Sequence, residues 1–410
     1  MTKLLVLGGR FAALTAAYTA KRLLGNKIDI TLINDKPYAV FRPNLPHVAL
    51  GLAKPEELEF DLKSALSRKG INFINGKVVR IDANKNAVYY LDSNGKEHIE
   101  RYDYLIVGFG AKLGVEKIKG FNKYGYSVCE PEYALKLYNR LKEFKGGNIA
   151  IGSGVFYQGS LRKRGKYPES WAPKADSACE GPVFEMSIML PPFLKRLGVY
   201  NKTHITIFTP GSDILTDLSE SARRLVRDLY KKMGYELVTD FRIKEIREKE
   251  IISEDGKKIK ADIAIVLPPY EANDVAKSST PELFDDAGFG LTDEHMRSIS
   301  YDNIYFVGDA NQLTVPKLGA LAVFTARIAA EDLANRLGVN VKIESYDPKI
   351  YCIADNPLEN TGVEVVDNTL FNGGISRVTE SKAKHMAKSM LYKYFIWTKG
   401  DMALDQYFEQ

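Results

Sequence analysis

Three cysteines, Cys129, Cys179 and Cys352, are the side chains of this sequence best suited to redox chemistry. A thiolate attacks sulfur and can break or form a disulfide, so cysteines that meet in a fold can transfer two electrons. The three lie far apart in the sequence, without a CxxC spacing or nearby histidines, and a zinc site is therefore not expected. Residue counts alone leave two interpretations open: unrelated buried thiols, or a redox site that the fold assembles.

The first glycine-rich turn, GGRFAA at residues 8–13, is the start of an incomplete dinucleotide fingerprint. Gly8 suits the tight turn and Ala13 suits the helix-packing position, but Arg10 replaces the glycine that lets the backbone approach a pyrophosphate. Asn34 and Asp35 end the following predicted strand, where a contact to the ribose is expected. By position we prefer Asn34, with Asp35 next.

Two later segments strengthen the prediction of a nucleotide site. YDYLIVGFGA (102–111) and NIYFVGDA (303–310) resemble the second and the late motifs of flavoproteins with two dinucleotide-binding domains. That resemblance implies that Gly308 and Asp309 meet the ribityl chain and pyrophosphate of FAD. We therefore predict FAD as the cofactor; the alternative is that the glycines only end strands and that Asp309 caps the segment after it.

A second fingerprint begins at residues 148–160, NIAIGSGVFYQGS, and is not completed. Tyr157 stands where a glycine would let the helix pack closely against the strand, and a basic, proline-containing insert follows. The next strand closes on Thr209 and Pro210, without the acidic residue that would hold a ribose. We expect NADH to bind poorly here, and the insert instead carries Cys179.

The hydrophobic pattern predicts an α/β fold with two Rossmann-like domains and an α+β tail. Strands at 3–8 and 28–34 flank a helix at 11–24, and a helix near 58–68 is followed by strands around 71–81 and a hairpin at 86–102. We expect an FAD domain from 1–111 and 300–340, a second, degenerate NAD-type domain inserted at 112–299, and a C-terminal membrane- and quinone-binding region at 341–410.

Composition and sequence pattern argue against a nucleic-acid-binding protein and against a protein that spans a membrane. The chain has 410 residues, 45% of them hydrophobic, and 57 basic against 52 acidic residues give a net charge of +5, without a motif that reads nucleic acid. No apolar stretch is long enough to span a membrane and no cleavable signal is visible, so we expect the protein on the cytoplasmic side.

The chain resembles sulfide:quinone oxidoreductases along nearly its whole length, particularly an archaeal branch. The matching segments are GGRFAA, FRPNLPHVALG, SVCEPEYA, DSACEGPVFEM, VPKLGALA and YCIADNP, together with a basic amphipathic C-terminus. Each cysteine falls in a matching segment, and the resemblance therefore favours redox chemistry over buried thiols.

The resemblance implies a role for each cysteine. Cys179 and Cys352 would form a sulfur-bridged pair that HS⁻ attacks to give a persulfide, and Cys352 would then attack the flavin ring. Cys129 would have an auxiliary role at the flavin rim. The motifs predict these cofactor-binding residues: Gly8, Gly9, Phe11, Ala12, Asn34, Asp35, Arg42, Val79, Gly110, Ala111, Gly308, Asp309, Lys317, Leu318 and Gly319. Lys317 and the helix start at Leu318 and Gly319 would stabilise negative charge on the reduced ring, unless Lys317 is simply solvated.

The C-terminal run TESKAKHMAKSMLYKYFIWTKG predicts a helix that lies in a membrane interface. Apolar residues recur at helical spacing, and we place Lys382, Lys384, Lys388 and Lys393 on other faces, facing anionic lipid. A helix docked on the protein body is the alternative. Phe41, Tyr394 and Phe395 are the residues that we expect near a quinone, the electron acceptor. We therefore expect peripheral association with the cell membrane at its cytoplasmic face, and leave a homo-oligomer open.

Three other functions remain to be weighed. A type II NADH:quinone dehydrogenase shares the expected fold and membrane helix but needs the fingerprint that this chain lacks. A soluble sulfide dehydrogenase would pass its electrons to a haem protein. A flavin-stabilised scaffold or sensor would be reduced by neither NADH nor sulfide.

Overall fold

The computed structural model describes residues 1–160, 171 and 173–403. Its first sheet is parallel, in the strand order β20-β9-β1-β2-β5. The strands span Ile304–Phe306 (β20), Tyr104–Val107 (β9), Thr2–Leu7 (β1), Ile28–Asn34 (β2) and Asn72–Asn75 (β5). This is the sheet that the glycine-turn motifs predicted, because each motif follows one of its strands.

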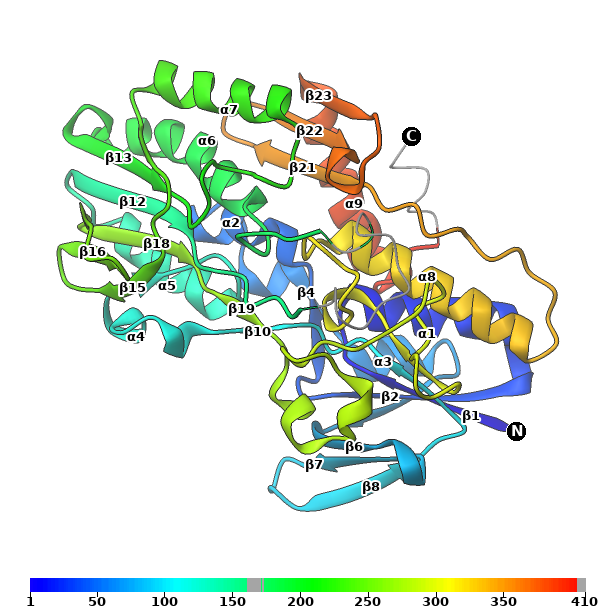
Figure 1. Ribbon diagram of the computed structural model, residues 1–410. Helices are drawn as coiled ribbons and strands as arrows, with labels where there is room; N and C mark the ends of the chain where they lie inside the picture. The colour runs from blue at the N-terminus through cyan, green and yellow to red at the C-terminus, as the bar shows by residue number, and fades with distance from the viewer. Residues whose placement is uncertain (161–170, 172, 404–410) are drawn as a thin grey trace.

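Helix α1 (Phe11–Leu24) and helix α8 (Gly319–Arg336) pack against each other on this sheet (Figure 1). Both are rich in alanine, a small side chain with high helix propensity, and most of their residues are buried. Helix α8 starts at Gly319, close to the helix start expected at Leu318 and Gly319. Pro316 and the extended backbone of Leu318 precede it, and proline has no N–H to donate within a helix.

The second sheet is also parallel, in the order β11-β18-β12-β13-β14, and confirms the second Rossmann-like unit. Its strands are Gly125–Tyr126 (β11), Ile263–Leu267 (β18), Gly147–Ser153 (β12), Thr203–Phe208 (β13) and Glu236–Val238 (β14). Three helices accompany them: α5 (Pro131–Leu141), α6 (Gly181–Arg196) and α7 (Glu220–Met233).

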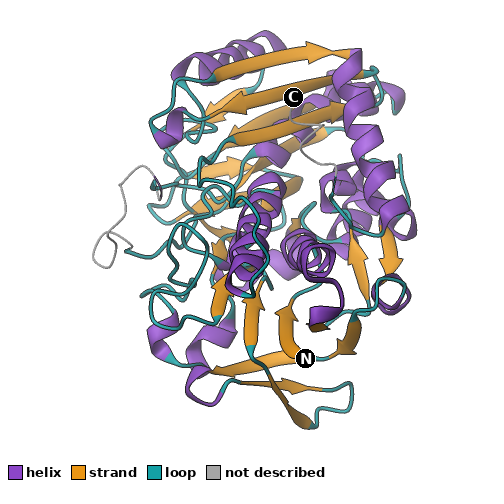
Figure 2. Cartoon of the chain, turned by 90° about the vertical axis from the view of Figure 1, so that its right-hand side faces the viewer, coloured by secondary structure: helices purple, strands orange, loops and turns teal. Residues whose placement is uncertain are grey.

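The C-terminal region is a three-stranded antiparallel sheet followed by a helix. Strands β21 (Ile350–Asn356), β22 (Thr361–Asp367) and β23 (Ser376–Ser381) lead into α9 (Lys382–Thr398), which packs on β21 and β22. The sheet lies at the top of the molecule in Figure 2, and Figure 1 shows it beside the sheet that contains β12 and β13. In the described part of the chain, no helix is both long and apolar enough to cross a membrane.

Shorter elements complete the fold. A hairpin of β6 (Lys77–Asp82), β7 (Ala87–Leu91) and β8 (Glu97–Arg101) extends from the first sheet, and β15 (Ile243–Ile246), β16 (Glu250–Ser253) and β17 (Lys258–Lys260) form a similar unit beside the second. The others are β3 (Tyr38–Val40), α2 (Leu45–Ala49), β4 (Glu59–Asp61), α3 (Leu62–Ser67), β10 (Lys112–Leu113), α4 (Phe121–Tyr124) and β19 (Tyr270–Glu271).

The helix expected near 58–68 is wrong in its first half. Leu58, Phe60 and Leu62 are buried while Glu59 and Asp61 are not, a period of two that favours the strand β4. Asp61 then caps α3, accepting a 2.7 Å hydrogen bond from the Ser64 N–H.

Residues after 273 return to the first sheet. Val275, Leu283 and Phe284 share a core with Leu105 and Val107 of β9. The division into domains at 111/112 and 299/300 stays a prediction.

Candidate functional site

Cys179 and Cys352, distant in the sequence, lie at the same pocket. Cys179 lies just before α6 and Cys352 lies in β21, and both line a small pocket together with Gly181, Asp217 and Leu318. A Cβ added to Gly181 would lie 3.4 Å from the Cys352 Sγ and 3.6 Å from the Cys179 Sγ. The glycine therefore leaves room for both sulfurs. All three cysteines are free thiols, and the predicted sulfur bridge stays a prediction.

The pocket favours neutral thiols. Burial, together with the charges of Cys352 and Asp217, raises the pKa of Cys179 well above its ordinary value. Burial raises the pKa of Cys352 to about 11, although the Lys388 ammonium acts in the opposite direction. A thiol here needs a base before it can act as a nucleophile.

Two acidic residues that were not predicted from the sequence lie near the cysteines: Asp217 lines the pocket, and Glu180 follows Cys179 in the chain. Burial raises the pKa of Asp217, which lines the pocket, to about 6. Burial likewise raises the pKa of Glu180, the residue after Cys179, to about 7. Both carboxyl groups can therefore exchange a proton near neutral pH, as a general acid or base requires. Adjacency to Cys179 could have indicated Glu180, but no local pattern marks Asp217.

Glu180 also shows what fills the incomplete second fingerprint. The Ser153 hydroxyl and the Leu215 N–H each donate a 2.6 Å hydrogen bond to its carboxylate. A Cβ added to Gly154 would lie 2.6 Å from the Pro269 ring, so this glycine makes room for the protein's own chain. Much of the basic insert, residues 161–170 and 172, lies outside the described residues.

The first glycine turn is closely packed, as a dinucleotide site requires. Gly8 has φ +115°, and a Cβ there would lie 2.4 Å from the Gly108 carbonyl oxygen. A Cβ on Gly9 would lie 2.7 Å from Asn34, so the turn meets the end of β2. Gly110 has φ +78° with open space beside it.

Arg10, the apparent fault in the first fingerprint, turns its side chain toward an acid. Its guanidinium donates hydrogen bonds of 3.0 and 2.9 Å to Glu130, and Arg42 contacts the same carboxylate. Two cations thus share one anion, and the Nε of Arg42 is buried without a hydrogen-bond partner in the described part of the chain. This surplus of positive charge fits a pyrophosphate. Glu130 was not predicted from the sequence.

The late motif joins this turn to the start of α8. Gly308 has φ +60°, and a Cβ there would lie 2.7 Å from Ala12, while Gly319 approaches Phe11. Burial raises the pKa of Asp309, which Lys317 opposes, and burial lowers the pKa of Lys317 to about 8.

Lys317 is buried rather than solvated. Its Nζ donates a 2.8 Å hydrogen bond to the Asn311 carbonyl and lies 4.4 Å from the Phe289 ring centroid. Leu318, next along the chain, lines the cysteine pocket. The start of α8 therefore connects the cysteines to the predicted cofactor site.

The remaining predicted cofactor residues lie in several different elements. Asn34 donates a 2.8 Å hydrogen bond to the Lys36 carbonyl, and Asp35 is exposed at the end of β2. The Val79 carbonyl, in β6, accepts a hydrogen bond from Ser278. Ala111 packs on the small core around Phe289.

Cys129 lies apart from the cysteine pocket. It directly precedes Glu130, and its N–H donates a 3.3 Å hydrogen bond to the Ser127 hydroxyl. Burial raises its pKa to about 11, while Arg42 acts in the opposite direction. The structure thus places Cys129 beside the arginine pair.

Two of the predicted quinone residues meet in an aromatic cluster. The ring centroids of Phe41 and Phe395 are 5.2 Å apart, and both rings contact Phe11. Tyr394 is partly buried against the same core. Phe41 and Phe395 are fully covered by protein, so their role toward a quinone stays a prediction.

The placement of the α9 lysines needs correction. Lys388 is buried and paired with Glu185, and Lys384 lies 2.7 Å from Glu364. Because the helix docks on the β21–β23 sheet, these two cations face protein acids rather than lipid. The outer face instead exposes Met386, Met390 and Trp397, at 62%, 56% and 80%.

The parallel sheets, the glycine turns and the shared cysteine pocket define a two-domain dinucleotide-binding oxidoreductase. The chain belongs to the family described as pyridine nucleotide-disulphide oxidoreductase, whose model matches residues 2–326. Membership of this family implies FAD as the cofactor, and the close turns and the arginine pair fit that group.

The similar proteins agree with the resemblance to sulfide:quinone oxidoreductases. The chain is 28% identical over 417 residues to the sulfide-quinone reductase of Aquifex aeolicus, covering 96% of this chain and 90% of the relative. The solved structure of the sulfide:quinone oxidoreductase from that bacterium matches with a TM-score of 0.84 at 24% identity, covering 98% of this chain and 93% of the other. A type II NADH:quinone oxidoreductase of Staphylococcus haemolyticus is 25% identical over 314 residues, 75% of this chain and 74% of the relative.

Proposed function

We propose that this protein oxidises sulfide to polysulfide or sulfur and passes the electrons through FAD to a membrane quinone. The observation that carries this proposal is the shared pocket of Cys179 and Cys352, which Leu318 connects to the start of α8. The similarity to the sulfide-quinone reductase of Aquifex aeolicus over 96% of the chain supports it.

The first chemical step uses only groups of this chain and the substrate. HS⁻ attacks the bridge between Cys179 and Cys352, one S–S bond forms while one breaks, and the products are a Cys179 persulfide and a Cys352 thiolate. Loss of two electrons and one proton from these groups then closes a bridge that is longer by one sulfur atom. FAD, when bound, accepts the two electrons and delivers them to the quinone.

Proton movement falls to Asp217, which lines the pocket, and to Glu180, the neighbour of Cys179 in the chain. With a pKa of about 6, Asp217 is mostly ionised at neutral pH and can take a proton from H₂S or from the persulfide. Glu180, with a pKa of about 7, can receive a proton in the same region. Cys129 acts through placement of the flavin, because it lies beside Arg42 rather than in the pocket.

The type II NADH:quinone dehydrogenase remains the second candidate, because such a protein is also similar to this chain. Against it, Glu180 accepts the hydrogen bond of the Ser153 hydroxyl in the second glycine turn, and Pro269 fills the space beside Gly154. We therefore expect sulfide, and not NADH, to reduce the flavin.

We further propose that α9 lies on the cytoplasmic face of the cell membrane. Met386, Met390 and Trp397 form its exposed apolar side, which would enter the headgroup region of a bilayer. The opposite side of α9 packs on the protein core near Phe41. A quinone that leaves the bilayer at α9 would therefore enter the protein close to Phe41.

Anaerobic mixing of the FAD-loaded protein with sulfide, followed by flavin absorbance, tests the proposal. Sulfide should bleach the flavin rapidly, and an added quinone should restore the colour, while NADH should bleach it slowly. Saturable reduction by micromolar NADH, with no reduction by sulfide, would select the dehydrogenase. Reduction by neither donor would leave only the non-enzymatic alternative.

A further inference from the structure

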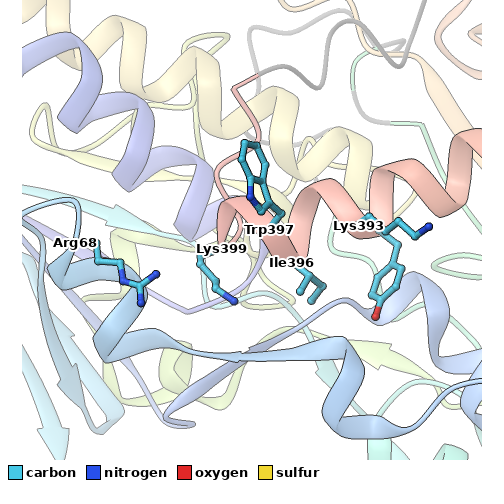
Figure 3. Close-up of a pocket in the computed structure, with 6 residues that line it drawn as sticks. Arg68, Lys393, Ile396, Trp397 and Lys399 are labelled. Atoms are coloured by element: carbon cyan, nitrogen blue, oxygen red, sulfur yellow. The ribbon is translucent and has the colours of Figure 1, made fainter.

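An open pocket of ≈ 500 Å³ lies between the last turns of α9 and the end of α3, away from the cysteines. Its lining consists of Arg68, Tyr392, Lys393, Ile396, Trp397 and Lys399. Figure 3 shows Arg68 and Lys399 facing the same space from different elements, while the indole of Trp397 projects from the other side of the helix. Three of the six lining residues are cations and none is an acid.

The cations of this pocket are available to an anion. Within the described residues, Arg68, Lys393 and Lys399 have no ion pair with a carboxylate. The nearby acid Asp401 is already engaged by Arg22 at 3.0 Å and by Lys69 at 3.1 Å. Among the described residues, the positive charge of the pocket is thus not neutralised by a carboxylate.

The pocket is held in shape by the end of α9. Lys399 has φ +58°, its N–H bonds to the carbonyls of Phe395 and Ile396, and its carbonyl accepts a 2.9 Å hydrogen bond from the Tyr18 hydroxyl. This fixes the point from which the Lys399 side chain extends. On the other side, the Tyr392 hydroxyl donates a 2.7 Å hydrogen bond to the Glu57 carbonyl.

We propose that this pocket binds a phosphate group, that of an anionic phospholipid at the membrane surface. Guanidinium and ammonium groups are the usual partners of phosphate, and Ile396 gives the pocket an apolar border for the glycerol and acyl region. The proposal rests on the membrane association of α9 proposed above, but not on the sulfide chemistry. It adds a preference for one class of lipid to that association.

Vesicle flotation of the full FAD-loaded chain tests the proposal. We compare phosphatidylcholine vesicles with phosphatidylcholine vesicles that contain phosphatidylglycerol, for the natural protein and for Arg68→Gln/Lys399→Gln. The matched control, Lys77→Gln/Lys96→Gln, removes the same charge from exposed residues of the β6–β8 hairpin, away from α9 (Figure 1). Because Lys399 helps to end α9, the exposed single variant Arg68→Glu is tested in parallel.

The natural protein should prefer the anionic vesicles, and the pocket variant should bind them roughly 25-fold more weakly, about fivefold for each charge removed. The control should bind like the natural protein, and all variants should keep the same binding to phosphatidylcholine. Millimolar inorganic phosphate at matched ionic strength distinguishes lipid phosphate from free phosphate as the ligand. Release of the protein from anionic vesicles would show that free phosphate also occupies the pocket, and no release would assign the pocket to the lipid.

Three results would each overturn the phospholipid pocket alone. They are equal binding of the natural protein to both vesicles, an equal loss in the control and pocket variants, and a failure of Arg68→Glu to weaken binding to anionic vesicles. Binding to neither vesicle would overturn the membrane association itself, and the pocket with it.

Discussion

Replacing Asp217 by asparagine separates its chemical role from its structural one. Burial raises the pKa of this carboxyl from 3.8 to about 6, so the folded protein holds an anion in a pocket that disfavours it. If Asp217 accepts a proton during sulfide oxidation, Asp217→Asn should lower the rate of flavin reduction by sulfide about 100-fold or more. The same change should make the protein more stable.

The size of the stability gain follows from the pKa. An acid whose pKa is higher in the folded state destabilises folding above the unfolded pKa, and here the displacement corresponds to about 3 kcal/mol at 1.36 kcal/mol per pKa unit. Below about pH 4 both states are protonated and the gain should vanish. It should grow between pH 4 and 6 and be complete above about pH 7, with about 3 kcal/mol as its upper limit.

The assay is stopped-flow reduction of the flavin by sulfide between pH 5 and 8, with thermal melting over the same range. Because sulfide itself titrates, the informative quantity is the ratio of natural to variant rates at each pH, which should rise through an apparent pKa of about 6. Asp213→Asn is the matched control, since Asp213 pairs with Arg223 and Arg227 outside the pocket. A ratio independent of pH, or equal losses in both variants, would refute the proton-transfer role.

Three further predictions test other parts of the molecule. Cys179→Ser and Cys352→Ser should each remove sulfide-dependent quinone reduction, with a loss of about 4 kcal/mol or more in transition-state stabilisation, and the double variant should be little worse; near-full activity in either single variant contradicts the pair. Asp309→Ala should weaken retention of FAD, measured by flavin absorbance after gel filtration, and undiminished retention would contradict the assignment of the late motif. Asp355→Asn should destabilise the protein by about 3 kcal/mol, because the Asp355 carboxylate contacts His47 at 3.2 Å and His385 at 2.6 Å. Burial raises the pKa of Asp355 but these partners lower it overall, so the stabilisation is present at neutral pH and is lost on acidification. An unchanged melting temperature of the variant would refute this prediction.

The glycine turns were predictable because their chemistry is local. Gly8 and Gly308 need positive φ values and close neighbours, and each follows a short apolar strand within a few residues. Consecutive residues meet these requirements, so the sheet, the first turn and the late motif could be predicted from the local sequence. The shared location of Cys179 and Cys352 did not follow from local pattern, and only the family resemblance predicted it.

The positions of two charged side chains depend on partners from other elements, which the sequence did not indicate. Arg10 looked like an obstacle in the first turn, yet Glu130, at the start of α5, draws its side chain away. Lys388 looked like a lipid-facing cation, yet Glu185 of α6 pairs with it in the core. Neither partner has a fixed spacing from the residue that it binds, so no sequence period could reveal the pair.

The second glycine turn bears on the proposed electron donor, because the protein's own groups occupy it. The insert that follows β12 ends in Cys179 and Glu180, and the Glu180 carboxylate accepts hydrogen bonds from the Ser153 hydroxyl of this turn and from the Leu215 N–H. The same segment therefore engages a group of the turn and supplies a cysteine of the pocket. Removing the carboxylate alone should not create an NADH site, because Pro269 would still occupy the space beside Gly154 and Thr209 would still stand in place of the ribose acid. Glu180→Gln should thus leave NADH a poor reductant while altering the sulfide reaction near pH 7, and rapid bleaching of this variant by NADH would contradict this expectation.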